Sequence, residues 1–306
     1  MKVGIDLGGS HIAIGLVDDN SEITQKRTYY MSERKHGTVE EYIIDCIAKG
    51  INEILDNSSL KMKDIEQIGI AAPGSPRNGH IKNAVNLGID DFNIAEELNK
   101  KLSKNEDIII KVINDGKSAA LAEKKIGSLK EFSDCVFLCI GTGIGGAAFI
   151  NNEFLSPKRN AGFEFGHMVI KKDGEPCNCG NRGCFEAYCS KGKFKSKMQE
   201  ILNIPGYICA KELIAIIKNN ISNKKVKELL EEYIDNLALG ISNIINILEP
   251  EAISIGGSMS HYEELIFEGL KEKINNGTYL FNKQNPPQIF SAKAGNDAGI
   301  IGATLL

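Results

Sequence analysis

The sequence predicts an α/β protein built from two related lobes. Residues 2–17 (KVGIDLGGSHIAIGLV) and 135–150 (CVFLCIGTGIGGAAFI) are each expected to form two apolar strands joined by a glycine-rich turn. Elsewhere, short apolar strands alternate with segments in which apolar residues recur at helical spacing, as is typical of α/β folds. Because the same glycine-tipped hairpin occurs twice, at 2–17 and at 135–150, we expect two related halves of the protein that close on one ligand.

The first hairpin has Asp6 at the end of its first strand and Gly8, Gly9 and Ser10 in its turn. Glycines permit close approach, so the backbone amides of such a turn can cradle phosphate oxygens. The neighbouring Asp6 suits a magnesium ion held through water. A plain hairpin with a polar turn is the alternative at this stretch.

The second hairpin places Gly141, Thr142 and Gly143 in its turn. Neither turn has the GxxxxGK[ST] pattern of a P-loop, and neither is a good GxGxxG that leads into a helix, so P-loop and Rossmann folds are disfavoured. One phosphate loop in each lobe is instead the plan of the actin-like, ribonuclease-H-like kinases.

Composition limits the classes of function. The chain has 306 residues, of which 42% are apolar and 25% charged, with a formal net charge of −4, so two globular domains without a strongly basic face are expected. We therefore expect no nucleic-acid or membrane partner. The start of the chain does not resemble a signal peptide and there is no apolar run of about 18 residues, which predicts a cytoplasmic protein with reduced cysteines.

Three of the eight cysteines fall within eight residues, as Cys177-x-Cys179-x4-Cys184. With His167 upstream, this spacing predicts a closed Cys3His zinc site, which would be structural because no position is left for water. A reduced cysteine loop or a disulfide is the alternative, although a CxC disulfide ring is strained. Such a site would fix the neighbouring carboxylates of Glu164 and Glu186 relative to each other.

The remaining pattern predicts helices and strands in alternation. The expected elements are helices over 41–57, from Asn93 to near Leu102, and over 116–125, 225–248 and 262–274, and strands over 65–72, 108–113 and 252–255. Gly74 follows one strand, Asn114 and Asp115 follow another, and Gly256 and Gly257 end a third. The ends of strands are where α/β proteins place ligands, although Asp115 could simply cap its helix.

Three motifs resemble those of the ROK family of repressors, uncharacterised reading frames and sugar kinases: ExGH at 164–167, CxCGxxGCxE at 177–186 and NDxxxAAxxE at 114–123. The resemblance extends from Asp6 to Ala303. It implies a two-lobed actin-like ATPase or ribonuclease-H-like fold with a structural zinc site. The implied N-terminal lobe is 1–115 plus about 291–306, and the C-terminal lobe is 116–290.

The family resemblance also implies an ATP-dependent hexokinase, most specifically a glucokinase that forms glucose 6-phosphate with ATP, Mg²⁺ and structural Zn²⁺. Asp115 matches the family's general base. The implied sugar ligands are Gly74, Asn114, Asp115, Glu164, His167 and Glu186. The implied nucleotide and magnesium contacts are Asp6, Gly8, Gly9, Ser10, Gly141, Thr142, Gly143, Gly256 and Gly257, and the implied zinc ligands are His167, Cys177, Cys179 and Cys184.

Other members of the family define the alternatives. The same motifs occur in kinases of N-acetylmannosamine and N-acetylglucosamine, some relatives accept polyphosphate, and homodimers are common. A non-catalytic sugar-sensing regulator is the alternative from another class, although we find no N-terminal helix-turn-helix pattern. Phe163 stands where the family usually has Gly, and it is expected either to narrow the sugar pocket or to point into the core.

Overall fold

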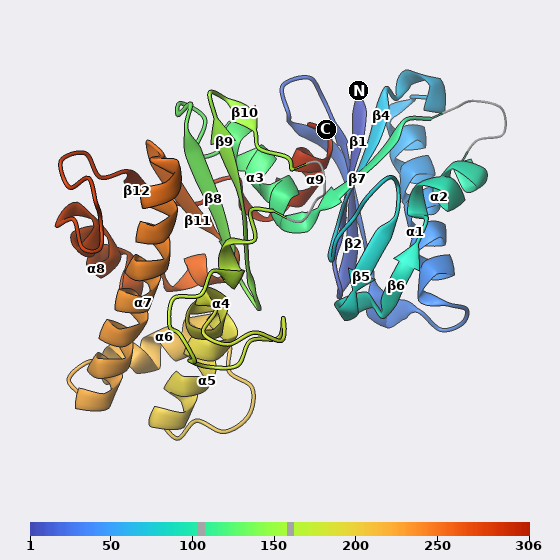
Figure 1. The fold of residues 1–306 in the computed structure, drawn as a ribbon. Coiled ribbons are helices and arrows are strands. Elements are labelled where there is room, and N and C mark those ends of the chain that lie inside the picture. Colours follow the sequence, from blue (N-terminus) through green and yellow to red (C-terminus); the bar gives the residue numbers. More distant parts are fainter. Residues whose placement is uncertain (103–107, 158–161) are drawn as a thin grey trace. The chain divides into compact units, whose positions relative to one another are not determined.

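The computed structural model describes residues 1–102, 108–157 and 162–306, which form two compact units. Unit 1 comprises residues 1–130 and 293–306, and unit 2 comprises 131–292. Each unit contains a five-stranded mixed sheet with helices (Figure 1). The lobe boundary expected after Asp115 falls instead after Lys130, because helix α3 (Asp115–Ile126) packs against helix α9 (Ala298–Ala303) within unit 1.

The sheet of unit 1 has the strand order β3-β2-β1-β4-β7. Its strands are β1 (Lys2–Leu7), β2 (His11–Val17), β3 (Ile23–Tyr30), β4 (Gln67–Ala72) and β7 (Ile110–Asn114). The first three strands pair antiparallel, whereas β4 lies parallel to both β1 and β7. The carboxyl ends of β1, β4 and β7 therefore meet at one edge of the sheet, where Asp6, Gly74 and Asn114 were expected to act.

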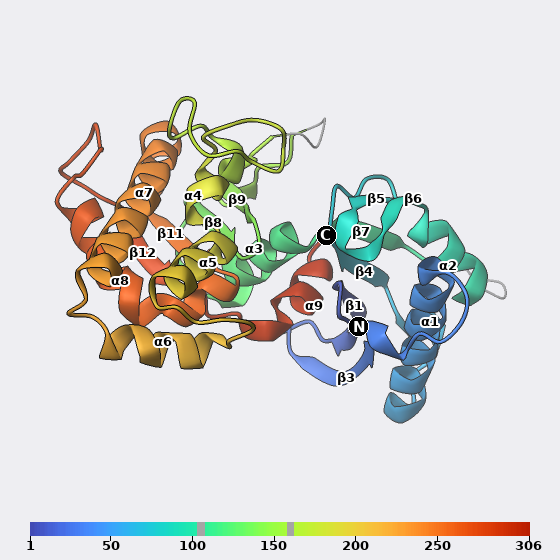
Figure 2. The same cartoon turned by 90° about the horizontal axis from the view of Figure 1, so that it is seen from below.

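Helices cover both faces of this sheet. Helices α1 (Val39–Ser58) and α2 (Ile94–Leu102) pack against each other, and the apolar stripe of α1 shares the main core with the strands. On the other face, α9 lies directly against β1 and β4 (Figure 2). A Cβ atom on Gly69 would lie 1.8 Å from the carbonyl oxygen of Ala303, so only glycine permits this close approach. The small hairpin β5 (Ile81–Ala84) and β6 (Ile89–Phe92) completes the unit.

The helix start expected at Asn93 is confirmed, whereas the helix expected over 41–57 begins two residues earlier, at Val39. Thr38 caps α1 in a capping box with Glu41, and the Asn93 side chain accepts a hydrogen bond from the amide of Glu96 at the start of α2. The closing segment of the chain returns to unit 1, as expected from the resemblance.

A buried carboxylate secures the place where the chain leaves and re-enters unit 1. Glu123, on α3, is 1% exposed, and its oxygens accept hydrogen bonds from the amides of Ser128, Lys293 and Ala294 at 2.6 to 3.1 Å. A carboxylate with this many donors is satisfied despite burial. Glu123 therefore fixes both crossing segments to one helix.

Unit 2 repeats the strand order of unit 1, as β10-β9-β8-β11-β12. Its strands are β8 (Cys135–Ile140), β9 (Ile144–Ile150), β10 (Glu153–Phe154), β11 (Ala252–Gly256) and β12 (Gln288–Ser291). As in unit 1, the first strand pairs antiparallel with the second and parallel with the fourth. The two predicted glycine-tipped hairpins are thus confirmed as corresponding parts of two sheets with one topology.

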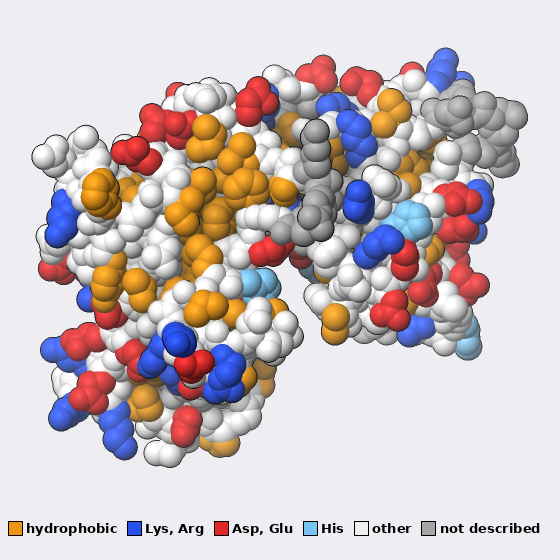
Figure 3. Space-filling view, in the orientation of Figure 1, with side chains coloured by type: hydrophobic (Ala, Val, Ile, Leu, Met, Phe, Trp, Pro, Cys, Tyr) orange, Lys and Arg blue, Asp and Glu red, His pale blue; other side chains and the backbone are white. Residues whose placement is uncertain are grey.

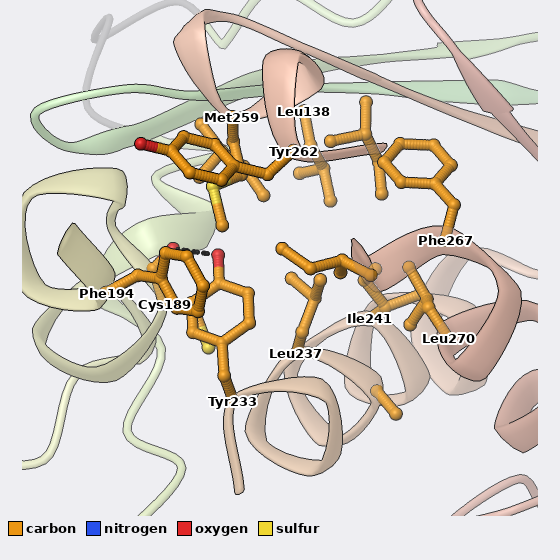
Figure 4. Close-up of a cluster of buried hydrophobic side chains, with 14 of the residues drawn as sticks. Leu138, Cys189, Phe194, Tyr233, Leu237, Ile241, Met259, Tyr262, Phe267 and Leu270 are labelled. Carbon is orange, nitrogen blue, oxygen red and sulfur yellow. Dashed lines mark hydrogen bonds between the residues drawn. The ribbon is translucent and has the colours of Figure 1, made fainter. Parts of the chain in front are cut away.

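A layer of packed helices covers one side of the unit 2 sheet: α4 (Phe185–Cys189), α5 (Lys191–Ile201), α6 (Ala210–Asn219), α7 (Lys224–Leu248) and α8 (Glu263–Asn275). Most apolar residues of α7 are buried, as predicted, and the helix ends at Leu248 with Glu249 as its C-cap, just before Pro250. In the core, the Tyr233 hydroxyl donates to the carbonyl of Cys189 at 2.8 Å and its ring lies 4.8 Å from that of Phe194 (Figure 4). These contacts join α4, which follows the cysteine motif, to the longest helix of the unit.

On the face drawn in Figure 3, acidic and basic side chains are interspersed rather than gathered by sign. Among the described residues, no helix combines the length and apolar character needed to cross a membrane.

Candidate active site

In unit 1, Asn114 ties the ends of two parallel strands together. Its side-chain nitrogen donates to the carbonyl of Gly74 at 3.1 Å, and its side-chain oxygen accepts from the amide of Lys117 at 3.2 Å. Gly74 has φ of +83°, and a Cβ atom there would lie 2.2 Å from the carbonyl of Lys82, so the turn requires glycine. Gly74 and Asn114, both predicted sugar ligands, are thus brought together.

Asp115 is the first residue of α3, but Asn114 and not Asp115 is the residue that caps the helix. The alternative in which Asp115 merely caps is therefore wrong. The Asp115 carboxylate is exposed and accepts a hydrogen bond from the amide of Gly116 at 2.8 Å. Desolvation by the surrounding protein raises its pKa, and the Gly116 amide opposes part of that rise. A carboxylate with a raised pKa that remains open to solvent is suited to accept a proton.

Asp6, at the end of β1, forms an acidic pair with Asp115. Burial raises the pKa of Asp6, the charge of Asp115 adds to the rise, and His11 opposes it. The start of α9 closes over this carboxylate, since a Cβ atom on Gly299 would lie 2.5 Å from Asp6 Cγ. Two neighbouring carboxylates with raised pKa values fit a divalent cation, because its charge favours their ionised forms.

The glycine turn of unit 1 is held by its own strands. The amide of Gly8 donates to the carbonyl of His11 at 2.9 Å, and the carbonyl of Ser10 accepts from the amide of Met31, the residue that follows β3. Gly9 and Ser10 are exposed, and Asn86 lies against Gly9. The tip is therefore accessible to a ligand.

In the glycine turn of unit 2, the amide of Gly141 donates to the carbonyl of Gly143 at 2.8 Å, and the turn is also held from outside its hairpin. The carbonyl of Gly141 accepts from the amide of Lys191 at 2.9 Å, and the amide of Ile144 donates to Glu186 Oε2 at 2.8 Å. Thr142, at the tip, is exposed.

Gly256 and Gly257, at the end of β11, lie beside this second turn. Gly257 has φ of +76°, and a Cβ atom on it would lie 2.6 Å from the carbonyl of Ile140 at the end of β8. A Cβ atom on Gly141 would lie 3.7 Å from the Ser258 hydroxyl oxygen. The two glycine motifs of unit 2 thus form one polar, backbone-rich corner.

The four predicted metal ligands lie together in unit 2. The ligand atoms of His167, Cys177, Cys179 and Cys184 are all within 4.8 Å of one another, and the three cysteines are free thiols. Cys177 Sγ lies 3.7 Å from His167 Nδ1, and Cys179 Sγ lies 3.7 Å from Cys184 Sγ. Tetrahedral zinc with bonds of about 2.0 to 2.3 Å requires ligand separations of about 3.5 to 3.8 Å. The donor set and its spacing therefore fit zinc.

Burial and then the neighbouring thiols raise the pKa of Cys184 to about 12. Because metal ligation needs the thiolate, binding of a cation here must release that proton.

The carboxylates beside the cluster occupy different environments. Glu164 is exposed and precedes the single turn that carries His167, whose Nδ1 faces the cysteines and leaves Nε2 for another partner. Glu186 is half-buried on α4. Phe163 packs against the unit 2 core beside Phe165, with ring centroids 6.2 Å apart, so its ring joins the core. Its φ of +61° explains why a glycine would suit this position.

Two features of the site were missed by sequence reasoning. The Lys191 amide donates to the second glycine turn, and Glu186, which was predicted only as a sugar ligand, accepts a hydrogen bond from that turn. The only available signal was position, because both residues closely follow Cys184. Hydrogen bonds donated by backbone amides do not depend on the type of the donor residue, so they leave no pattern in the sequence.

The ROK family profile matches residues 2–306, and the chain belongs to that family. It is 29% identical to a glucokinase of Thermotoga maritima, over 98% of this chain and 95% of the relative. It is 26% identical to an N-acetyl-D-glucosamine kinase of Escherichia coli, over 100% of this chain and 99% of the relative. It is also 26% identical to a xylose repressor of Caldicellulosiruptor bescii, over 91% of this chain and 71% of the relative. The crystal structure of a ROK hexokinase from Thermus thermophilus superposes with a TM-score of 0.81 at 26% identity, covering 99% of this chain and 96% of that chain.

Proposed function

We propose that this protein is a sugar kinase that transfers the γ-phosphoryl group of ATP to the 6-hydroxyl of a hexose, most specifically glucose. The observation that carries the proposal is the Asp115 carboxylate, which stands at a strand end with a raised pKa beside Asp6. The kinase names of full-length relatives support the same class of enzyme.

In the proposed reaction, Asp115 accepts the proton of the sugar 6-hydroxyl as that oxygen attacks the γ-phosphorus in line. The new O–P bond forms as the bond from the γ-phosphorus to the bridging oxygen breaks, and ADP leaves. Magnesium, near Asp6, would neutralise charge on the phosphates. Exposed Gly9 and Ser10 of the first turn and Thr142 of the second turn are the proposed phosphate contacts, together with the remaining predicted residues Gly8, Gly141, Gly143, Gly256 and Gly257.

The proposed sugar ligands are Gly74, Asn114, Glu164, His167 and Glu186. Carboxylates and amides suit this task because they pair with neighbouring hydroxyls. We assign His167 Nε2 to the sugar, since Nδ1 faces the cysteines. Zinc, when bound by the cluster, would supply rigidity rather than chemistry, because four protein ligands complete its shell.

The proposal extends to a homodimer that works in the cytoplasm, in carbohydrate metabolism and glycolysis, without nucleic-acid or membrane partners. Light scattering of the purified protein tests the dimer directly. A monomer at working concentration would overturn that part of the proposal alone.

Two rivals are separated by one assay. ADP release is measured with glucose, N-acetylglucosamine and N-acetylmannosamine, each with MgATP and with polyphosphate. Highest kcat/KM for glucose with ATP supports the proposal, and a preference for an acetylated sugar replaces the substrate while keeping the enzyme class. Sugar binding without phosphate transfer to any of the three sugars would instead support the regulator, a possibility raised by the repressor among the relatives.

A further inference from the structure

The segment that follows metal ligand Cys184 holds the second glycine turn. Glu186 Oε2 accepts the amide of Ile144 at 2.8 Å, and the Lys191 amide donates to the carbonyl of Gly141 at 2.9 Å. These bonds join the two ends of the turn to α4 and to the start of α5. Both anchors come from residues remote in sequence from the hairpin that they hold.

The segment that carries His167 packs on the same hairpin. A Cβ atom on Gly166 would lie 2.2 Å from the carbonyl of Ile144, and one on Gly146 would lie 2.8 Å from the ring of Phe165. The backbone at Gly166 therefore packs directly against the backbone of β9, with no side chain between them. Both parts of the chain that supply metal ligands thus contact the stretch at Ile144.

The Glu186 carboxylate lies between the turn and the cysteine cluster. Its Oε2 atom is so close to the turn that a Cβ atom on Gly143 would lie 2.5 Å from it, so that position accepts only glycine without movement. Its Oε1 atom lies 3.9 Å from Cys177 Sγ. One carboxylate therefore spans from a proposed phosphate contact to a proposed metal ligand.

We propose that Glu186 is a positioning residue through which the Cys3His cluster orders the glycine turn at residues 141–144. The metal site would then govern nucleotide binding as well as the sugar wall. The link to nucleotide rests on the proposed kinase function, whereas the link between cluster and turn does not. Loss of metal should loosen the second turn and leave the first turn, at residues 8–10, unchanged, because the first is held within its own strands.

The first test is hydrogen–deuterium exchange on the metal-loaded protein, the protein after chelation, Glu186→Ala and Glu186→Gln, with the metal content of each measured. We expect exchange in peptides that cover 141–146 to rise about tenfold after chelation and in Glu186→Ala, since the amide of Ile144 loses its acceptor. Glu186→Gln retains an acceptor oxygen and should rescue most of the protection. Peptides from 2–17 are the internal control.

Each pattern of exchange decides the inference. If exchange at 141–146 is unchanged after chelation, the metal does not order the turn. If exchange is unchanged in metal-replete Glu186→Ala, Glu186 does not order the turn. Faster exchange in 2–17 as well would indicate general unfolding and would also overturn a specific tether.

A second pair of variants tests the turn without touching a proposed sugar ligand. Lys191 is the first residue of α5 and follows Ser190, whose φ and ψ of −65° and 146° are compatible with a following proline. Lys191→Pro therefore removes the donor to Gly141 at a helix position that tolerates proline, and Lys191→Ala keeps the donor. We expect the KM for ATP of the proline variant to be about fivefold above that of the alanine variant, with equal KM for sugar. Equal KM values for ATP would contradict the link to nucleotide, while the exchange results would stand even without any kinase activity.

Discussion

The turn between β1 and β2 and the turn between β8 and β9 occupy the same place in two sheets of one strand order. In unit 1, the turn is secured by the carbonyl of His11, in β2, and by the amide of Met31, the residue that follows β3. In unit 2, the turn has a hydrogen bond of its own, from the amide of Gly141 to the carbonyl of Gly143, and it is also secured by Glu186 and Lys191, which follow the cysteine motif. Equal topology therefore does not mean equal support, because of the two turns only the second is hydrogen-bonded to the segment that follows the cysteine cluster.

The two units also differ in the chemistry at their strand ends. Unit 1 offers the carboxylates of Asp6 and Asp115, both with raised pKa values, whereas unit 2 offers backbone-rich glycine turns beside sulfur and imidazole ligands. Variants that act on one unit alone can test the proposed division between proton transfer in unit 1 and phosphate binding in unit 2.

The largest expected effect is that of Asp115→Asn. An amide cannot accept the sugar proton, so kcat should fall about 1,000-fold while sugar affinity remains. Steady-state kinetics and calorimetric titration with sugar provide the two measurements, and Asp56→Asn, on an exposed part of α1, is the control. Wild-type turnover by Asp115→Asn would remove this residue from the reaction.

The same residue should set the acid side of the pH profile. Because the pKa of Asp115 is raised, the base becomes protonated at a higher pH than an ordinary aspartate, and kcat/KM should decline there as pH falls.

Glu123→Ala should give the largest loss of stability, and it should act on unit 1. The change leaves the partly buried amides of Ser128, Lys293 and Ala294 without their carboxylate, which costs about 3 kcal/mol in the free energy of unfolding. Denaturant unfolding measures the loss, and Lys125→Ala, an exposed change on the same helix, is the control. A loss no larger than that of the control would show that Glu123 is not needed to fix the crossing segments.

A matched glycine pair tests the turns themselves. Gly143→Ala places a methyl group against Glu186 Oε2 and should cost about 1 to 3 kcal/mol, whereas Gly8→Ala meets its nearest neighbour at 3.5 Å, an ordinary contact. Neither glycine has a positive φ, so backbone strain does not separate the two variants. Thermal unfolding should show a lower Tm only for Gly143→Ala. Equal shifts would contradict the difference in support.

The sequence predicted local features well because their causes are local. The helix start at Asn93 follows from its capping residue, and the clustering of His167 with Cys177, Cys179 and Cys184 was expected from the cysteine spacing. Two features were not predictable in this way: that α3 belongs to unit 1, and that Glu186 is hydrogen-bonded to Ile144, 42 residues away. Both depend on how distant segments pack, and packing against backbone leaves little trace in residue type.

The smallest expected effect concerns Asp6, the half-buried carboxylate at the end of β1. The pKa of Asp6 is raised in the folded protein, so between the unfolded value near 3.9 and the folded value the native state binds more protons, and stability falls as pH rises. Asp6→Asn removes this penalty and should raise the free energy of unfolding near pH 7 on the order of 0.5 kcal/mol.

Asp91 provides the opposite sign within the same unit. Its hydrogen bonds with Lys82 and His80 hold the pKa of its exposed carboxyl below the ordinary value, so its contribution is present at neutral pH and is lost as pH falls. The free energy of unfolding is measured by chemical denaturation between pH 4 and about 8. For Asp6→Asn, it should decline less toward neutral pH than in the unsubstituted protein, and for Asp91→Asn it should be slightly lower at neutral pH. If Asp6→Asn instead loses stability near pH 7, the carboxylate is stabilising as an anion, and the cost of its burial is not the dominant influence on this end of β1.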